Sequence, residues 1–166
     1  RAYALAMQYG GDKNYEGFKT LEAEWELLAA ALPRLLTDDN HRLQAVCDQL
    51  GQFLNFTGRW DEWIWLSEQA EERALDAGDK ESATERAYQA GMAYLFRNQA
   101  AEVLACADRA AKHWQKSTPR HKAVAIQLRG LGCELEKNYP AAIAAYHEAI
   151  EIFRSISPES DDVAIA

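Results

Sequence analysis

The sequence has little glycine, proline or cysteine. Its 166 residues include 9 glycines, 4 prolines and 3 cysteines, so few positions force a regular element to end. Cys47, Cys106 and Cys133 are odd in number and far apart, which excludes a disulfide framework and a CxxC metal site. We expect the three cysteines to be small apolar residues of the core.

Long apolar runs are also missing. No stretch approaches the roughly 18 apolar residues that a membrane helix requires, and the first residues lack the pattern of a signal peptide. The sequence therefore predicts a cytoplasmic protein with no membrane contact. Because the chain begins with Arg1 and helical patterns run into both ends, we expect a piece of a longer protein.

Positive charge is in the minority, with 18 Lys and Arg against 26 Asp and Glu and a net charge of −8. A chain without a dense basic stripe is not typical of nucleic-acid-binding proteins, so we expect no direct contact with nucleic acid. One basic segment holds Arg86, Arg97, Arg109, Lys112 and Lys116. We interpret it as a solvated face rather than as a site for phosphate or an acidic partner.

Motifs that carry chemistry are absent as well. The sequence contains neither of the glycine-rich patterns that cradle nucleotide phosphates. Its four histidines show no HExxH spacing, and no serine lies in a G-x-S-x-G elbow. The sequence therefore predicts no enzyme, no cofactor and no metal site.

What the sequence does contain is a series of segments rich in Ala, Leu and Glu, separated by short polar turns. β-branched residues alternate nowhere with polar ones, so strands find no support. This pattern predicts an all-α fold. The expected helices span residues 2–9, 15–36, 40–57, 60–77, 80–97, 99–116, 119–137 and 140–156.

The expected breaks between helices have local causes. Gly58 can adopt a positive φ where one helix ends, and Asn98 and Asn138 can do the same less readily. Asp39 and Asp79 are suited to cap the helices that follow them. These signals predict tight helical hairpins.

Small residues recur at a fixed interval. Gly51, Gly91 and Gly130 lie 40 and 39 residues apart, and an alanine follows each of them after 19 residues. Such regularity is typical of stacked helix pairs. We therefore expect a leading segment of helices at 1–40, hairpins at 41–77, 80–116 and 119–156, and the start of a further, truncated repeat at 157–166.

The repeated residues resemble the tetratricopeptide repeat, whose pattern is W-x2-L-G-x2-Y followed by A-x3-F, A and P. The resemblance implies an α-solenoid of antiparallel helix hairpins that acts as a non-catalytic scaffold for a protein or peptide, here with a period of about 40 rather than the usual 34. The matching segments are Leu50-Gly51-x2-Leu54, Ala90-Gly91-x2-Tyr94, and Ala142-x3-Tyr146 with Ala149.

A second stretch is similar to the E-x-E-x-N-L-x-A-A-L helix that opens the repeat region of bacterial STAND-type NTPases. That resemblance implies the sensor or autoinhibitory region of a larger signalling NTPase. The alternative is the ligand- or peptide-receptor region of a DNA-binding transcriptional regulator. The likeness lies within Gly17–Leu36, at Glu22, Glu24, Leu27, Leu28, Ala30 and Leu32.

The first helices of stacked hairpins line a concave face, and there we predict the partner-binding residues. In chain order these are Asp48, Gln52, Asn55, Phe56, Glu85, Tyr88, Met92, Phe96, Gln127, Leu131 and Glu134. Asp48, Glu85 and Glu134 would repel a peptide carboxylate. A basic or amide-rich peptide, or a folded neighbouring domain, would suit this face better.

Three tryptophans crowd one segment. Trp60 and Trp63 occupy positions at which the resemblance implies packing within a hairpin, so we expect both in the core. Trp65 is rotated about 200° from Trp63 on a helix. We therefore predict that Trp65 faces away, as a contact residue on the convex back of the array.

Overall fold

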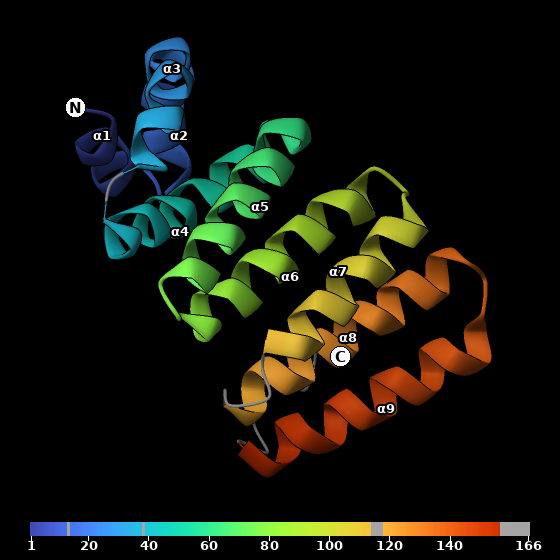
Figure 1. Cartoon of the computed structure of the whole chain (residues 1–166). Helices are drawn as coiled ribbons and strands as arrows, with labels where there is room; N and C mark the ends of the chain where they lie inside the picture. The colour runs from blue at the N-terminus through green and yellow to red at the C-terminus, as the bar shows by residue number, and fades with distance from the viewer. Residues whose placement is uncertain (13, 38, 114–117, 157–166) are drawn as a thin grey trace.

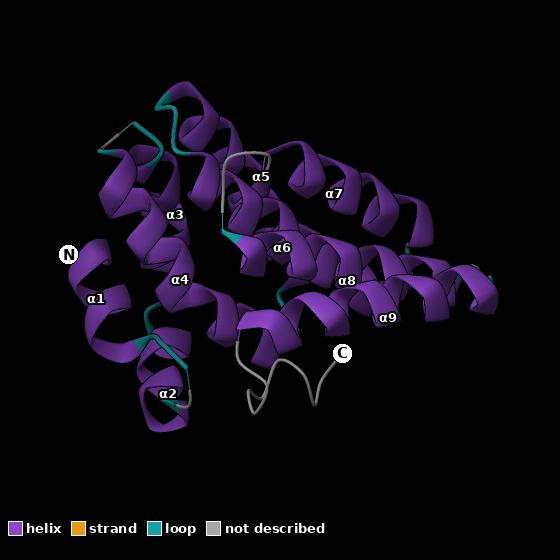
Figure 2. Cartoon of the chain, turned by 90° about the horizontal axis from the view of Figure 1, so that it is seen from below, coloured by secondary structure: helices purple, strands orange, loops and turns teal. Residues whose placement is uncertain are grey.

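The computed structural model describes residues 1–12, 14–37, 39–113 and 118–156. Within these ranges the chain forms nine α-helices and no strand (Figure 2), which confirms the all-α fold. None of these helices is long and apolar enough to span a membrane. The helices are α1 (Ala2–Tyr9), α2 (Tyr15–Ala23), α3 (Trp25–Leu35), α4 (Asn40–Phe56), α5 (Trp60–Asp76), α6 (Lys80–Phe96), α7 (Ala100–His113), α8 (Pro119–Leu135) and α9 (Tyr139–Ile156).

Helices α4 to α9 follow one another across the molecule in chain order (Figure 1). Each packs against the next one along the chain, and α6 also contacts both α4 and α8. The first three helices gather at one end, where α1 and α2 contact α4 (Figure 1). The predicted start of a further repeat at 157–166 lies outside the described residues, as do the last residues of the expected helix 99–116.

Caps and turns set the helix ends largely as predicted. Asp39 caps α4 by accepting a hydrogen bond from the backbone N–H of Arg42, and Asp79 caps α6 in the same way. The backbone φ is 69° at Gly58 and 57° at Asn98, so both residues end a helix in the left-handed conformation.

The prediction for Asn138 was wrong. The positive φ before α9 belongs to Lys137, at 61°. Asn138 instead accepts a hydrogen bond from the backbone N–H of Ala141, at 3.4 Å. The short side chain of Asn138 is well suited to cap the N-terminus of α9. Asn138 therefore does not take the left-handed conformation after α8.

The single helix predicted at 15–36 is in fact two helices, which meet at Glu24 with φ −100° and ψ 6°. Phe18 in α2 and Trp25 in α3 both pack on Phe53, with ring centroids 5.6 and 5.5 Å from it. The break therefore lets the chain wrap around one aromatic ring of α4. Glu24 is also held by Arg1, whose Nη2 donates to its Oε2 at 3.0 Å.

The core changes in character along the chain. Around α1 to α5 it is built from large side chains, among them Leu43, Leu50 and Phe53, which are fully buried. Around α6 the buried residues are mostly alanines, with four on α6 itself. Small residues let helix backbones approach closely, so α6 packs tightly on α5, α7 and α8.

Candidate functional site

A pocket of about 690 Å³ lies between α4 and α6, with contributions from α5 and from the link between α1 and α2. We call it the central pocket. Its volume falls in the range of small-molecule and cofactor sites. It is lined by Asp12, Asp48, Gly51, Gln52, Asn55, Trp63, Glu85, Tyr88, Gln89, Met92 and Phe96.

The central pocket brings together most of the residues predicted for the concave face. The members from α4 and α6 that line it are Asp48, Gln52, Asn55, Glu85, Tyr88, Met92 and Phe96. They come from two helices about 40 residues apart in sequence that lie side by side in the fold. The binding role of these seven residues stays a prediction.

Phe56 is placed differently. It is not part of the pocket lining, although 66% of the residue is exposed. Its ring lies 5.4 Å from that of Tyr15 and 5.7 Å from that of Phe18, measured between centroids. Phe56 therefore joins α4 to α2 instead of facing α6.

The three predicted residues of α8 also lie outside the central pocket. Leu131 is half-buried and packs against a small core cluster that contains Leu128. Glu134 is exposed and accepts a hydrogen bond from the Tyr146 hydroxyl at 2.8 Å. Gln127 is half-buried on the same helix.

Charge and polarity are graded along the pocket. Asp48 and Glu85 lie toward one end, and Asp12 is the third acidic residue of the lining. Among the residues that the structure describes, no lysine, arginine or histidine lines the pocket. Met92 and Phe96 lie toward the other end of α6, so an acidic end is followed by an apolar one.

Between these ends lies a floor made by Gly51, Trp63 and Gln89. A side-chain carbon added at Gly51 would lie 3.7 Å from both Trp63 Nε1 and Gln89 Nε2. Trp63 Nε1 and Gln89 Oε1 are buried, and neither has a hydrogen-bond partner among the described residues. The floor thus presents one unused donor and one unused acceptor.

Beneath the acidic end lies Arg86, a buried arginine that is only 1% exposed. Its Nη2 forms an ion pair with Asp48, and its Nη1 donates to the backbone carbonyl of Gln44 at 3.4 Å. Burial raises the pKa of the neighbouring Cys47 thiol, an effect that Arg86 opposes. The interpretation of Arg86 as part of a solvated face was therefore wrong.

Arg109 also departs from that interpretation. Its Nε donates to both carboxylate oxygens of Glu71, at 3.1 and 3.2 Å, and Glu71 is only 5% exposed. His113 Nε2 lies 2.9 Å from the same carboxylate. Arg97 forms an ion pair with Asp61. These cations serve contacts within the protein.

Sequence reasoning missed these polar contacts, but a signal for them exists. Asp48 and Arg86 are 38 residues apart, as are Glu71 and Arg109. Asn40 donates to Asp79 across 39 residues. These intervals are within one or two residues of the spacing of the small residues, so polar pairs at about that spacing were candidates for contact.

Trp63 and Trp65 separate in exposure as predicted, whereas Trp60, which was expected in the core, is only half-buried. Trp63 is buried, at 7% exposed, whereas Trp65 is 39% exposed. Trp60 is half-buried and stacks on Phe96, with ring centroids 5.9 Å apart and planes inclined by 15°. The contact role of Trp65 on the convex back stays a prediction.

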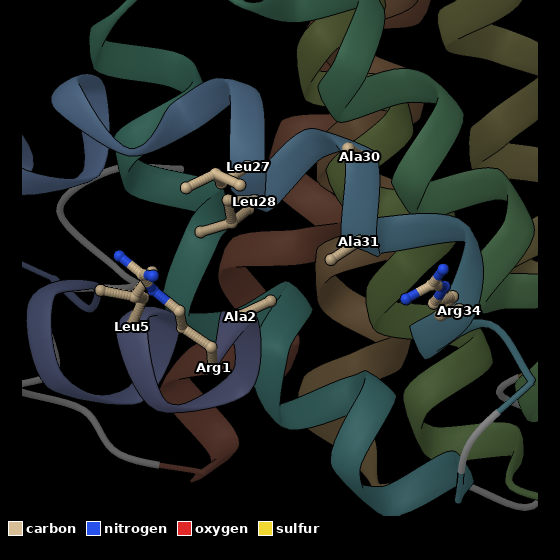
Figure 3. Close-up of a pocket in the computed structure, with 8 residues that line it drawn as sticks. All are labelled: Arg1, Ala2, Leu5, Leu27, Leu28, Ala30, Ala31 and Arg34. Carbon is tan, nitrogen blue, oxygen red and sulfur yellow. The ribbon is translucent and has the colours of Figure 1, made fainter.

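A second hollow, of about 300 Å³, lies between α1 and α3 (Figure 3). Its walls are mainly Leu and Ala side chains, and Arg1 and Arg34 are its charged members. Leu27, which is 59% exposed, is part of this hollow. Leu27 belongs to the stretch that resembles STAND-type NTPases, but its local pattern carries no sign of a hollow, because an exposed leucine on an amphipathic helix is ordinary.

The described residues bring together no group of His, Cys, Asp and Glu that could hold a metal ion. Comparison of the chain with protein-family models, with curated proteins and with solved structures finds no match.

Proposed function

We propose that this chain is a non-catalytic interaction module whose central pocket binds a peptide or an exposed segment of a protein. One observation carries the proposal: seven residues from α4 and α6 that the sequence pattern assigned to a common face line one pocket of about 690 Å³. A site of this kind needs a concave surface with polar groups that fix the ligand's orientation. The amides of Gln52 and Asn55 supply such groups.

The proposal includes an α-solenoid architecture related to the tetratricopeptide repeat. Three helix pairs, α4–α5, α6–α7 and α8–α9, support it. The first helices of neighbouring pairs contact each other, α4 with α6 and α6 with α8. In stacked repeats such helices form the concave face, and the central pocket lies between two of these helices, α4 and α6.

We further propose that the module works in the cytoplasm as the sensor or autoinhibitory region of a STAND-type NTPase. The three cysteines are buried and free, which suits a reducing compartment. The alternative is the receptor region of a transcriptional regulator. Reading the full-length gene distinguishes them: a Walker A motif upstream supports the first, and a helix-turn-helix supports the second. If the gene encodes neither motif, both assignments are contradicted and a plain scaffold remains.

The binding role is tested by selecting peptides from a random display library on the immobilised protein. We expect the selected peptides to lose affinity for the Gln52→Ala, Asn55→Ala double variant, because it removes two side-chain amides from the pocket. The matched control is Gln8→Ala with Gln69→Ala, which removes two amides outside the pocket. Circular dichroism checks that both variants remain helical.

The outcomes separate clearly. Peptides that bind the pocket variant as well as the wild type would place the site elsewhere and contradict the proposal. A library from which no peptide is enriched over an empty surface would contradict it too.

A further inference from the structure

We propose that the central pocket recognises an extended peptide with an arginine at one end and an aromatic residue four positions away. This inference rests on the proposed function and specifies its ligand. It follows from three features of the pocket: its acidic end, its unused floor atoms and its aromatic end.

The acidic end calls for a cation. Glu85 lines it without an ion-pair partner in the described part of the chain, Asp48 shares its charge with the buried Arg86, and Asp12 adds a third carboxylate to the same pocket. The ring of Tyr88 lies one helical turn from Glu85 in the same lining. Guanidinium groups pair with carboxylates and stack on aromatic rings. Arginine therefore fits this end better than a neutral side chain.

The floor calls for a peptide backbone. Among the described residues, Trp63 Nε1 has no acceptor and Gln89 Oε1 has no donor, although Trp63 is only 7% exposed and both side chains lie next to Gly51. Unpaired buried polar atoms cost free energy. A peptide offers a carbonyl to the first and an N–H to the second. Gln89 is only half-buried, so its side chain can rearrange as the peptide binds.

The far end calls for an aromatic or apolar side chain. Phe96 is 43% exposed, and its ring is held in place by stacking on Trp60. Met92 lines the pocket one turn earlier. A ring fixed in this way offers a surface on which a ligand ring can pack at little entropic cost.

The spacing follows from helix geometry. Glu85 and Phe96 are 11 residues apart on α6, which is about 16 Å along the helix axis. An extended peptide advances roughly 3.3 Å per residue, and side chains four residues apart share one face. Four residues span about 13 Å, and the length of an arginine side chain covers the remainder.

Isothermal titration with two peptides, Ac-Arg-Gly-Ser-Gly-Phe-NH2 and its reverse Ac-Phe-Gly-Ser-Gly-Arg-NH2, tests the proposal on the whole chain. We expect one of the two to bind and to shift the indole N–H resonance of Trp63. Citrulline in place of arginine should weaken binding by about threefold to fivefold, and alanine in place of phenylalanine by about tenfold. A shortened Ac-Arg-Gly-Phe-NH2 should bind no better than the alanine peptide.

Variants of the protein locate each end. Glu85→Gln should weaken the arginine peptide and leave the citrulline peptide unchanged, whereas Phe96→Ala should weaken both. The control is Glu102→Gln, which neutralises an exposed carboxylate of α7 outside the pocket. Equal binding of arginine and citrulline peptides, no binding by either orientation, or equal losses for both peptides in Glu85→Gln would overturn the inference.

Failure here is distinguishable from failure of the proposed function. Display-selected peptides that depend on Gln52 and Asn55 but lack the arginine and aromatic pattern would support the interaction module and contradict the arginine–aromatic ligand. Selected peptides whose affinity does not depend on the pocket residues would contradict both proposals.

Discussion

Arg86 is a charge that the fold keeps out of water, and Asp48 is its counter-charge. Removing one partner of such a pair leaves the other without compensation. Asp48→Ala should lower the free energy of unfolding by about 1–3 kcal/mol, less than for a fully buried pair because the Asp48 side chain is 56% exposed. Urea titration followed by circular dichroism measures the loss.

The cause of that loss can be isolated with a second background. In Arg86→Met the charge is gone, so adding Asp48→Ala should cost little further stability. If Asp48→Ala costs the same in both backgrounds, the ion pair is not the reason for its effect.

Tyr94 should ionise late. Burial and the neighbouring carboxylate of Glu68 raise its pKa to about 12, and its hydroxyl donates to Glu68 Oε1 at 3.1 Å. Because the unfolded chain would lose this proton near pH 10, the stabilisation from the hydroxyl is complete below pH 10 and is lost as the pH rises toward 12.

Absorbance at 295 nm measures that ionisation. The difference between wild type and Tyr94→Phe should appear near pH 12 in the folded protein and near pH 10 in denaturant. A difference signal near pH 10 in the folded protein would mean that Tyr94 is solvated.

At the scale of single residues, the sequence pattern predicted which residues share a helix face better than it predicted which side chains contact each other. Asp48, Gln52 and Asn55 share a helix face by spacing alone, and that face does line the pocket. The burial of Arg86 could not be read in the same way, because a mid-helix arginine has the same local pattern whether it is solvated or paired. Only the position of α4 beside α6 determines whether the arginine is solvated or paired.

Helix α6 can lie close to α7 and α8 because Gly91 has no side chain. A carbon added at Gly91 would lie 2.5 Å from Leu128 Cδ2 and 3.1 Å from Cys106 Cβ. Leu128 is fully buried and has nowhere to move. Gly91→Ala should therefore lower the free energy of unfolding by about 1–3 kcal/mol, despite the better helix propensity of alanine.

Gly51 provides the matched comparison. A carbon added there would meet its nearest neighbours at 3.7 Å, an ordinary contact. Gly51→Ala should leave stability unchanged or raise it by up to about 1 kcal/mol. Urea titration of the two variants side by side tests the pair, and similar losses at both positions would contradict the packing argument.

Asp79 connects two helices at their N-terminal ends. Its Oδ1 accepts from the backbone N–H of Ser82 at 3.0 Å, and its Oδ2 accepts from Asn40 Nδ2 at 3.1 Å. Asp79→Ala should lower the free energy of unfolding by about 1–2 kcal/mol. Asp79→Asn keeps a capping oxygen and should lose less, and thermal unfolding ranks the two. The prediction fails if the two variants are equally destabilised.

Helices were predictable as elements, but the break at Glu24 was not. The buried positions Phe18, Leu21, Trp25, Leu28 and Leu32 keep the helical spacing of three and four residues across it. Nothing in that stripe marks an end. Phe53, the ring against which both sides of the break pack, lies on another helix, and only the assembled fold places it there.

Across the whole molecule, the two halves should differ in local stability. Helices α4 and α5 belong to a cluster of large buried side chains, whereas α8 and α9 belong to smaller clusters that contain more alanine. Large side chains bury more apolar area per residue. Native-state hydrogen exchange should therefore be slower in α4 and α5 than in α8 and α9.

Peptide-resolved mass spectrometry measures that exchange. Equal protection in the two regions would mean that the chain opens as a single cooperative unit. Faster exchange in α4 than in α9 would contradict the argument from side-chain size.

The alanine-lined packing of α6 has a consequence for how this protein can change over generations. One wall of the central pocket is α6, and the distance of that wall from α4 depends on buried alanines that do not line the pocket. A single methyl group added behind α6 would move the wall by a fraction of an ångström. Natural variation can thus alter the width of the central pocket while every residue that lines it stays the same.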